Sequence, residues 1–160
     1  MTNIILSDDH NVVRQGIKAL LATEPDMKVI AEAADALNTI KLVRQHKPDI
    51  LVLDLMLGGM DGIDIIRQVI DCSPKTSVVI LSMHSNEAYV VKALKAGARA
   101  YVLKECTAEE LVTAVRQAVS GKRYLSSTLS ELAIKAYMET GNEGIHESYD
   151  TLTQREREIL

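Results

Sequence analysis

Five residues with reactive side chains stand where short apolar segments of the sequence end, and such segments are typical of buried strands. They are Asp8, Asp9, Asp54, Ser82 and Lys104. In an open α/β sheet, ligands bind at the carboxyl ends of parallel strands. We therefore expect three carboxylates, one hydroxyl and one ammonium group to share a single small cleft.

The combination of these residues is more informative than any one of them. An aspartate after a strand is commonly a helix cap or a turn former, and a lone serine or lysine there is commonly a turn or surface residue. Three carboxylates on one edge, however, repel one another and raise their own pKa values unless a cation compensates them. A few carboxylates completed by waters form the environment that Mg²⁺ prefers, and Lys104 adds a further positive charge.

Such a site suits phosphoryl transfer. A carboxylate beside Mg²⁺ and a lysine can act as a nucleophile and accept a phosphoryl group as an aspartyl phosphate. The metal and the ammonium group would stabilise the charge on the phosphoryl oxygens during in-line transfer. A nearby hydroxyl could then donate a hydrogen bond to the attached group.

Composition excludes several other classes of protein. The chain has 160 residues, 47% of them hydrophobic, with a formal net charge of −4 and neither Phe nor Trp. This length fits one domain plus an extension. The acidic balance argues against nucleic-acid binding by bulk electrostatics, and the scarcity of aromatic residues argues against a base-stacking platform.

The sequence predicts a cytoplasmic location and no membrane anchor. Its apolar runs are too short to span a bilayer, and its first residues lack the basic and apolar regions of a signal peptide. Cys72 and Cys106 have no second Cys or His at ligand spacing, so we expect them to be free thiols in a reducing compartment.

Short apolar segments alternate with segments of helical periodicity up to about residue 120. The predicted strands cover residues 4–6, 29–31, 50–53, 78–81 and 100–103. Because polar and apolar residues do not alternate within them, we expect five parallel strands covered by helices on both faces. Gly97 is expected to cap the fourth helix, and Thr107 with Glu110 forms a capping box for the fifth.

The pattern changes after the fifth predicted helix. Residues 125–139 have the spacing of one more helix, and residues 152–160 begin like another. We place the main domain at residues 1–121, a linker with a helix at residues 122–151, and the start of a further domain at residues 152–160.

The motifs around the reactive residues resemble the four signature regions of a bacterial response-regulator receiver domain. They are Asp8-Asp9-His10, residues 54–62 (DLMLGGMDG), residues 81–84 (LSMH) and residues 97–104 (GARAYVLK). The resemblance covers residues 2–120 in the right order and spacing. It implies a flavodoxin-like (βα)5 fold with a parallel five-stranded sheet of order 2-1-3-4-5.

The resemblance also implies a role for each acidic residue. Asp54 matches the phosphoacceptor of the family. Asp9 matches the direct Mg²⁺ ligand, and Asp8 matches the acid that holds Mg²⁺ through water. Met56 would contribute only its backbone carbonyl to the metal.

Three further residues match positions that contact the phosphoryl group or respond to it. Lys104 matches the lysine that contacts the phosphoryl group, Ser82 the switch hydroxyl, and Tyr101 the aromatic rotamer switch. One departure is the Leu57-Gly58 step, where many family members have Met-Pro; this change is expected to loosen the loop after the third strand.

Residues 152–160 resemble the start of a LuxR-type helix-turn-helix domain, which points to a transcriptional response regulator of the NarL/FixJ type. The resemblance implies that a histidine kinase phosphorylates Asp54 and that this controls DNA binding, with phosphorylation-dependent homodimers. DNA would be bound by a C-terminal domain beyond these 160 residues. The chemistry would be limited to phosphoryl acceptance and auto-dephosphorylation, so we expect no enzyme. A stand-alone receiver that acts through protein–protein contacts is the alternative.

Other readings of the acidic cleft fit the sequence less well. An aspartate-dependent phosphatase of the haloacid-dehalogenase type needs a second carboxylate two residues after the nucleophile, where this chain has Met56. A nucleotide-binding fold needs a glycine-rich turn after the first strand, and a flavin-binding module needs a hydroxyl-rich loop there. The acidic residues that follow the first predicted strand of this chain provide neither. His10 is expected at the rim of the cleft rather than in a catalytic role.

Overall fold

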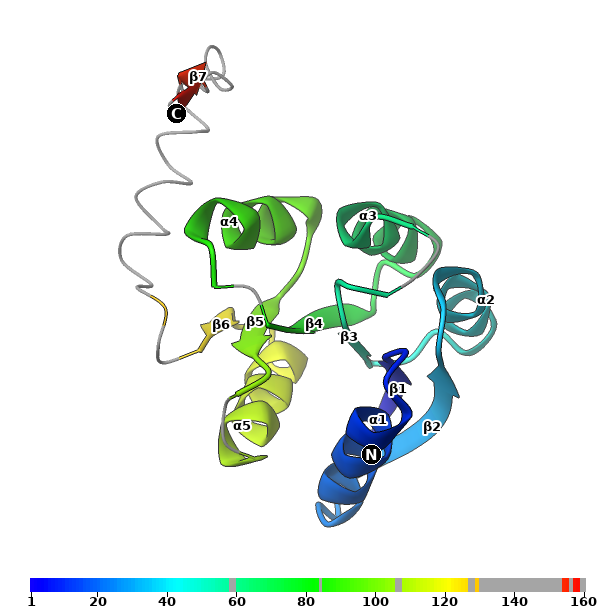
Figure 1. The fold of residues 1–160 in the computed structure, drawn as a ribbon. Helices are drawn as coiled ribbons and strands as arrows, with labels where there is room; N and C mark the ends of the chain where they lie inside the picture. Colours follow the sequence, from blue (N-terminus) through cyan, green and yellow to red (C-terminus); the bar gives the residue numbers. More distant parts are fainter. Residues whose placement is uncertain are drawn as a thin grey trace. The chain divides into compact units, whose positions relative to one another are not determined.

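The computed structural model describes residues 1–57, 60–83, 85–105, 108–126, 129, 154–155 and 157–158. Residues Met1–Ser126 form one compact unit, and residues Ser127–Leu160 form a second. Strands and helices alternate along the first unit (Figure 1). Its strands are β1 (Thr2–Ser7), β2 (Met27–Ala33), β3 (Ile50–Leu53), β4 (Ser77–Ser82), β5 (Ala100–Leu103) and β6 (Tyr124–Leu125). Its helices are α1 (Asn11–Ala22), α2 (Ala36–His46), α3 (Gly62–Cys72), α4 (Glu87–Ala96) and α5 (Ala108–Val119).

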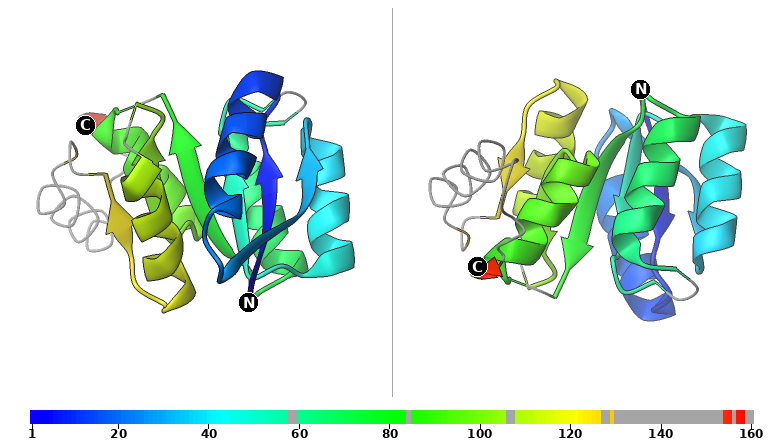
Figure 2. Two further views of the ribbon diagram at one scale, coloured as in Figure 1. Left: turned by 90° about the horizontal axis from the view of Figure 1, so that it is seen from below. Right: turned by 90° about the horizontal axis from the view of Figure 1, so that it is seen from above.

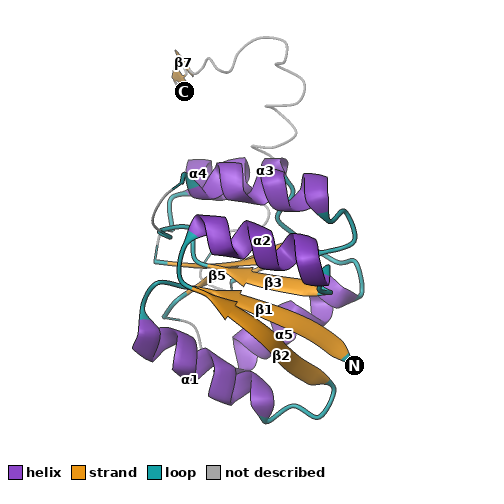
Figure 3. Cartoon of the chain, turned by 90° about the vertical axis from the view of Figure 1, so that its right-hand side faces the viewer, coloured by secondary structure: helices purple, strands orange, loops and turns teal. Residues whose placement is uncertain are grey.

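The six strands of this unit form one parallel sheet in the order β2-β1-β3-β4-β5-β6. The predicted α/β fold and its strand order 2-1-3-4-5 are therefore confirmed, and β6 is added at the edge. Helices α1 and α5 cover one face of the sheet, and α2, α3 and α4 cover the other (Figures 2 and 3). The winding reverses between β1 and β3, which is where an open α/β sheet binds its ligands.

The central strands are buried on both faces, which explains their unbroken apolar sequence. All four residues of β3 and all four of β5 are buried. Ile66 of α3 and Leu111 of α5 are buried as their helical spacing predicts. Along α1, Leu21 is fully buried, whereas Val13, in the first turn, is 37% exposed.

Local side chains and two glycines fix the loops that follow β3 and α4. Asp61 caps α3, because its carboxylate accepts a hydrogen bond from the backbone N–H of Ile63 (2.9 Å). The next residue, Gly62, approaches the loop after β3 so closely that an added Cβ would lie 2.8 Å from the carbonyl oxygen of Leu55. Gly97 ends α4 with φ at 122°, which confirms the predicted glycine cap.

Tyr124 and Leu125 form an edge strand, so the helix predicted over residues 125–139 is wrong at its first residue. The reason is pairing: β6 lies beside β5, and the backbone N–H of Ser126 donates to the carbonyl of Tyr101 (3.0 Å). The compact unit accordingly extends past the domain boundary expected at residue 121. Apart from Ser126 and Leu129, the rest of the predicted linker helix lies outside the described residues.

The second unit contains two short paired strands, β7 (Gln154–Arg155) and β8 (Arg157–Glu158). The helix predicted over residues 152–160 is therefore wrong at these four residues. A helix of this length is unstable in water unless it packs against a partner, because the cost of nucleation is spread over too few hydrogen bonds. In the part of the chain that the structure describes, no helix is long and apolar enough to cross a membrane.

Candidate functional site

Two buried aspartates lie side by side at the point where the sheet winding reverses. Asp8 follows β1 and Asp54 follows β3, and both are almost fully buried. The backbone N–H of Asp54 donates to the carbonyl of Ser7 (2.9 Å), and that of Asp8 donates to the carbonyl of Ala33 (3.1 Å). These bonds continue the strand ladders past the ends of the strands. Backbone hydrogen bonds between neighbouring strands therefore hold both carboxylates together at the carboxyl ends of β1 and β3.

Lys104 supplies the positive charge between these two carboxylates. Its Nζ lies 3.0 Å from Oδ2 of Asp54 and 3.3 Å from Oδ2 of Asp8. Its backbone N–H donates to the carbonyl of Ser82 (2.8 Å), so the neighbouring strand positions it. Burial alone would lower the pKa of Lys104, but the hydrogen bond and charge of Asp54, together with Asp8, outweigh burial and hold the pKa above its usual 10.5. The ammonium group is therefore charged at neutral pH.

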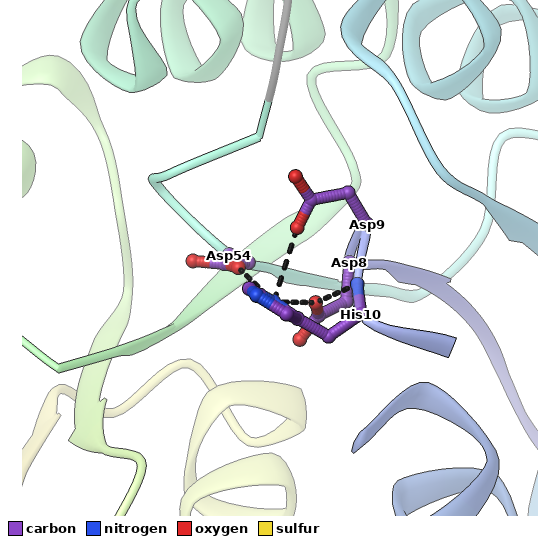
Figure 4. Close-up of side chains that lie close together, drawn as sticks. All are labelled: Asp8, Asp9, His10 and Asp54. Atoms are coloured by element: carbon purple, nitrogen blue, oxygen red, sulfur yellow. Dashed lines mark hydrogen bonds and ion pairs between the residues drawn. The ribbon is translucent and has the colours of Figure 1, made fainter. Parts of the chain in front are cut away.

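His10 and Asp9 complete the cluster from the loop between β1 and α1 (Figure 4). The Nδ1 atom of His10 lies 3.1 Å from Oδ1 of Asp9, 3.2 Å from Oδ1 of Asp8 and 4.0 Å from Oδ2 of Asp54. The His10 side chain is 63% exposed, which agrees with the predicted position at the rim. Its ring nevertheless points at all three carboxylates, and the sequence interpretation missed this contact. The only signal in the sequence is that His10 directly follows the acidic pair.

The charge and geometry of this cluster fit a divalent cation. Asp8, Asp9, His10 and Asp54 each offer one ligand atom, and these four atoms lie within 4.8 Å of one another. Among the described residues, Asp8 Oδ2 is buried yet accepts no hydrogen bond, although Lys104 is near. The Lys104 ammonium group compensates part of the charge on this oxygen, and an oxygen-seeking cation would compensate the rest.

Met56 lies two residues after Asp54 and is held to it through the backbone. Its N–H donates to Oδ1 of Asp54 (3.0 Å), while its side chain is largely exposed. This contact orients the Asp54 carboxylate, and it involves the N–H of Met56 rather than the carbonyl that the resemblance assigns to the metal. Gly58 of the Leu57-Gly58 step and His84 of the LSMH motif lie outside the described residues.

Ser82 and Tyr101 form a buried pair on neighbouring strands: Ser82 is the last residue of β4, and Tyr101 is the second residue of β5. Both are fully buried. Burial raises the pKa of the Tyr101 phenol above its usual 10.0, and a side-chain hydrogen bond with Ser82 opposes part of that rise. Tyr101 is therefore in the inward position, in contact with the predicted switch hydroxyl.

The structure thus brings together four of the five reactive residues, and it places the fifth, Ser82, against Tyr101. The family model of the response regulator receiver domain matches residues 4–116 of the chain. The chain belongs to this family.

Relatives and solved structures agree with membership of the receiver family. YhcZ of Bacillus subtilis (strain 168), described as an uncharacterized transcriptional regulatory protein, is 38% identical over 157 residues, which cover 98% of this chain and 72% of the relative. A LuxR-family two-component response regulator from Aurantimonas sp. matches with a TM-score of 0.77 and 35% identity, covering 89% of this chain and 98% of that structure.

A third match is the isolated receiver domain of RcsB from Salmonella enterica serovar Typhimurium, solved in the presence of the phosphomimetic BeF3⁻. Its TM-score is 0.76 at 28% identity, and the alignment covers 82% of this chain and 97% of that structure. The chain is therefore a response-regulator receiver domain of the kind found in LuxR-family two-component transcription regulators.

Proposed function

We propose that this receiver domain accepts a phosphoryl group from a histidine kinase on Asp54, with Mg²⁺, and thereby controls a DNA-binding output. The observation that carries the proposal is the placement of the Asp54 carboxylate. It is buried at the switch point of the sheet, and its Oδ2 lies 3.0 Å from the Lys104 ammonium group. The partly exposed His10 and Asp9 side chains border it on the side of the β1–α1 loop.

The transfer would be an in-line displacement at phosphorus. An oxygen of Asp54 forms the new O–P bond while the P–N bond to the kinase histidine breaks, and the imidazole nitrogen keeps the electron pair. Lys104 is placed to neutralise the phosphoryl oxygens through its ammonium group. A divalent cation, when bound, would spread the remaining negative charge of the transferred group.

The metal would be held by the residues that fit it best in charge and position. We propose that Asp9 binds it directly, that Asp8 acts through water, and that Asp54 and the backbone carbonyl of Met56 complete the protein ligands. Support comes from the four clustered ligand atoms and the buried Asp8 oxygen that accepts no hydrogen bond in the described part of the chain.

Ser82 and Tyr101 would carry the signal away from Asp54. We propose that the Ser82 hydroxyl bonds the attached phosphoryl group and that Tyr101 adjusts its position in response. Their burial and mutual hydrogen bond mean that a change at one must be felt by the other.

The proposed output is regulation of transcription through DNA and a phosphorylation-dependent homodimer. A relative with 38% identity is described as a transcriptional regulatory protein, which favours this output over a stand-alone receiver. The net charge of −4 argues that the receiver itself is not held by DNA, so DNA contact would belong to other residues of the regulator. We further propose that the protein works in the cytoplasm and that its chemistry ends with loss of its own phosphoryl group, without turnover of an external substrate.

Phosphorylation by a small acyl phosphate tests the proposal in the absence of a known kinase. The chain is incubated with acetyl phosphate, with and without Mg²⁺, and the phosphorylated fraction is resolved by phosphate-affinity electrophoresis. We expect labelling of the wild type only when Mg²⁺ is present, and none of Asp54→Asn. The matched control is Asp49→Asn, whose carboxylate is exposed and pairs with Lys75, and it should be labelled like the wild type. Stoichiometric labelling of Asp54→Asn would refute the assignment.

A further inference from the structure

The imidazole of His10 is directed at the acidic cluster by its local backbone. His10 occupies the position before the first residue of α1, with extended backbone angles, but its side chain makes no capping hydrogen bond to the helix. Its backbone N–H donates instead to Oδ1 of Asp8 (2.8 Å). This short turn points the ring toward the carboxylates rather than along the helix.

One nitrogen atom of this ring faces all three carboxylates at once. Its Nδ1 is nearly equidistant from Asp8 and Asp9, at 3.2 Å and 3.1 Å, and it lies 4.0 Å from Asp54 (Figure 4). The ligand atoms of these four residues fall within 4.8 Å of one another, so a single cation could contact all of them. The buried Asp8 Oδ2, which accepts no hydrogen bond from a described residue, is a further polar atom of the same cluster.

We propose that His10 is a direct nitrogen ligand of the divalent cation, so that the site prefers Mn²⁺ and later first-row metals over Mg²⁺. The inference rests on the proposed function, since it concerns the same metal site. Imidazole nitrogen suits borderline transition metals, whereas Mg²⁺ favours an all-oxygen octahedron with several waters. If the His10 imidazole joins the ligands proposed above, the site should therefore gain affinity for transition metals from His10, and little for Mg²⁺.

A different role for His10 makes the opposite prediction. If the ring is only a hydrogen-bond partner of the carboxylates, an incoming cation has to displace it. Removal of the ring would then strengthen binding of every divalent cation, Mg²⁺ included. The direction of the change in affinity thus separates a ligand from a competitor.

The test compares metal binding by the whole chain and two histidine variants at about pH 8, where free imidazole is neutral. Binding of Mn²⁺ is followed by the electron paramagnetic resonance signal of the free ion, and binding of Mg²⁺ by competition against Mn²⁺. The variants are His10→Ala and a matched control, His46→Ala, which removes an exposed histidine from the last turn of α2. Pulsed electron paramagnetic resonance of the bound Mn²⁺ detects coupling to the ¹⁴N nucleus of an imidazole that coordinates the ion.

We expect His10→Ala to bind Mn²⁺ roughly 10-fold more weakly or worse, with a much smaller change for Mg²⁺, and to lose the imidazole coupling. The wild type and His46→Ala should keep both the tighter binding of Mn²⁺ and the imidazole coupling. Equal or tighter Mn²⁺ binding by His10→Ala, with no imidazole coupling in the wild type, would overturn the inference alone. Failure of the wild type to bind either ion, or binding that survives Asp9→Asn unchanged, would overturn the proposed metal site itself.

Discussion

At the scale of single residues, the site depends on one lysine that compensates two buried carboxylates. Lys104 is 12% exposed, and its ammonium group lies within 3.3 Å of an oxygen of Asp8 and within 3.0 Å of one of Asp54. Buried charges are tolerated only when they are paired, and a buried pair that loses one member leaves an uncompensated ion. Lys104 is therefore expected to matter for stability as well as for phosphoryl transfer.

Replacement of Lys104 by methionine should destabilise the domain when no divalent cation is present. We expect a loss of about 2–4 kcal/mol in the free energy of unfolding, since two buried carboxylates remain without their cation. Added Mg²⁺ should restore part of it, because binding to the folded state is stabilising. Urea denaturation measures both effects. Lys75→Met, which removes an exposed partner of Asp49 (3.8 Å), should cost less than about 1 kcal/mol; equal losses in the two variants would contradict this account.

The sequence predicts most of the site at this scale but not the direction of each side chain. Asp8, Asp54 and Lys104 could be placed together because parallel strands end at one edge, whatever their rotamers. The contact of His10 with the carboxylates could not, because it depends on the turn made by its backbone N–H with Asp8. The inward position of Tyr101 likewise depends on packing between two strands.

At the scale of secondary-structure elements, an ion-pair group joins α1 to β2. Glu32 of β2 accepts from Arg14 (3.0 Å) and pairs with Lys18 (2.9 Å), both on α1. The hydrogen bond from Lys18 lowers the pKa of Glu32 below its usual 4.5, partial burial opposes this, and Arg14 lowers it further. The group therefore ties the helix that follows the acidic loop to the edge of the sheet.

This pKa shift predicts how stability depends on pH. Because the pKa of Glu32 is lower in the folded state than in the unfolded state, its contribution is present above pH 4.5 and is lost as pH falls through the folded-state pKa. The wild type should be more stable than Glu32→Gln at pH 7, and the difference should shrink below about pH 4.5. Urea denaturation across this range measures it. A difference for Glu32→Gln that does not vary with pH would refute the role of this ion pair.

A second prediction at this scale concerns the close approach of α3 to the loop after Asp54. An added Cβ at Gly62 would lie 2.6 Å from Leu55 Cδ2 and 2.8 Å from the Leu55 carbonyl oxygen, so the loop or the helix must move. We expect Gly62→Ala to cost about 1–3 kcal/mol of stability by thermal or urea unfolding. Gly16→Ala, in open space within α1, should instead stabilise by roughly 0.5–1 kcal/mol. Similar effects of the two changes would show that the contact at Gly62 is not tight.

The elements themselves were largely predictable, with failures near the C-terminal end. The five main strands follow from unbroken apolar segments, which are typical of a parallel sheet covered on both faces. Strand β6 was missed because Tyr124 and Leu125 are too few to show a period of two, and because their pairing depends on the free edge of β5. Residues 154–155 and 157–158 were predicted as helix from a local capping pattern and a family resemblance, and neither can predict structure that depends on packing.

At the scale of the whole molecule, two hydrogen bonds link β5, which leads to Lys104, to Ser126, the residue that follows β6. Lys104 follows Leu103, whose N–H donates to the hydroxyl oxygen of Ser126 (2.8 Å), and the N–H of Ser126 donates to the carbonyl of Tyr101. A movement of Lys104 toward a phosphoryl group would therefore be felt directly at the strand that leads out of the domain. The energy available for such coupling is typically about 1–3 kcal/mol.

Hydrogen exchange tests this link. Addition of the phosphomimetic BeF3⁻ with Mg²⁺ should change amide exchange in peptides that cover β4, β5 and β6, because Ser82, Tyr101 and Ser126 lie on one connected path. Ser82→Ala should bind the phosphomimetic but respond more weakly, since it lacks the hydroxyl that bonds Tyr101 and that we propose to bond the phosphoryl group. Peptides of β2, the strand at the opposite edge of the sheet, provide the internal control, because their exchange should not change. Identical exchange with and without BeF3⁻ across β4–β6 would exclude this path.

The central claim, that Asp54 is the phosphoryl acceptor, is tested most directly by locating the modified residue. The chain is phosphorylated with acetyl phosphate and Mg²⁺, the acyl phosphate is reduced with borohydride to homoserine, and the peptides are sequenced by mass spectrometry. Four candidate side chains lie within a few ångströms of one another, so the position of the change is decisive. We predict conversion at Asp54 alone. Conversion at Asp8 or Asp9, or a phosphoryl group found on His10, would contradict the account.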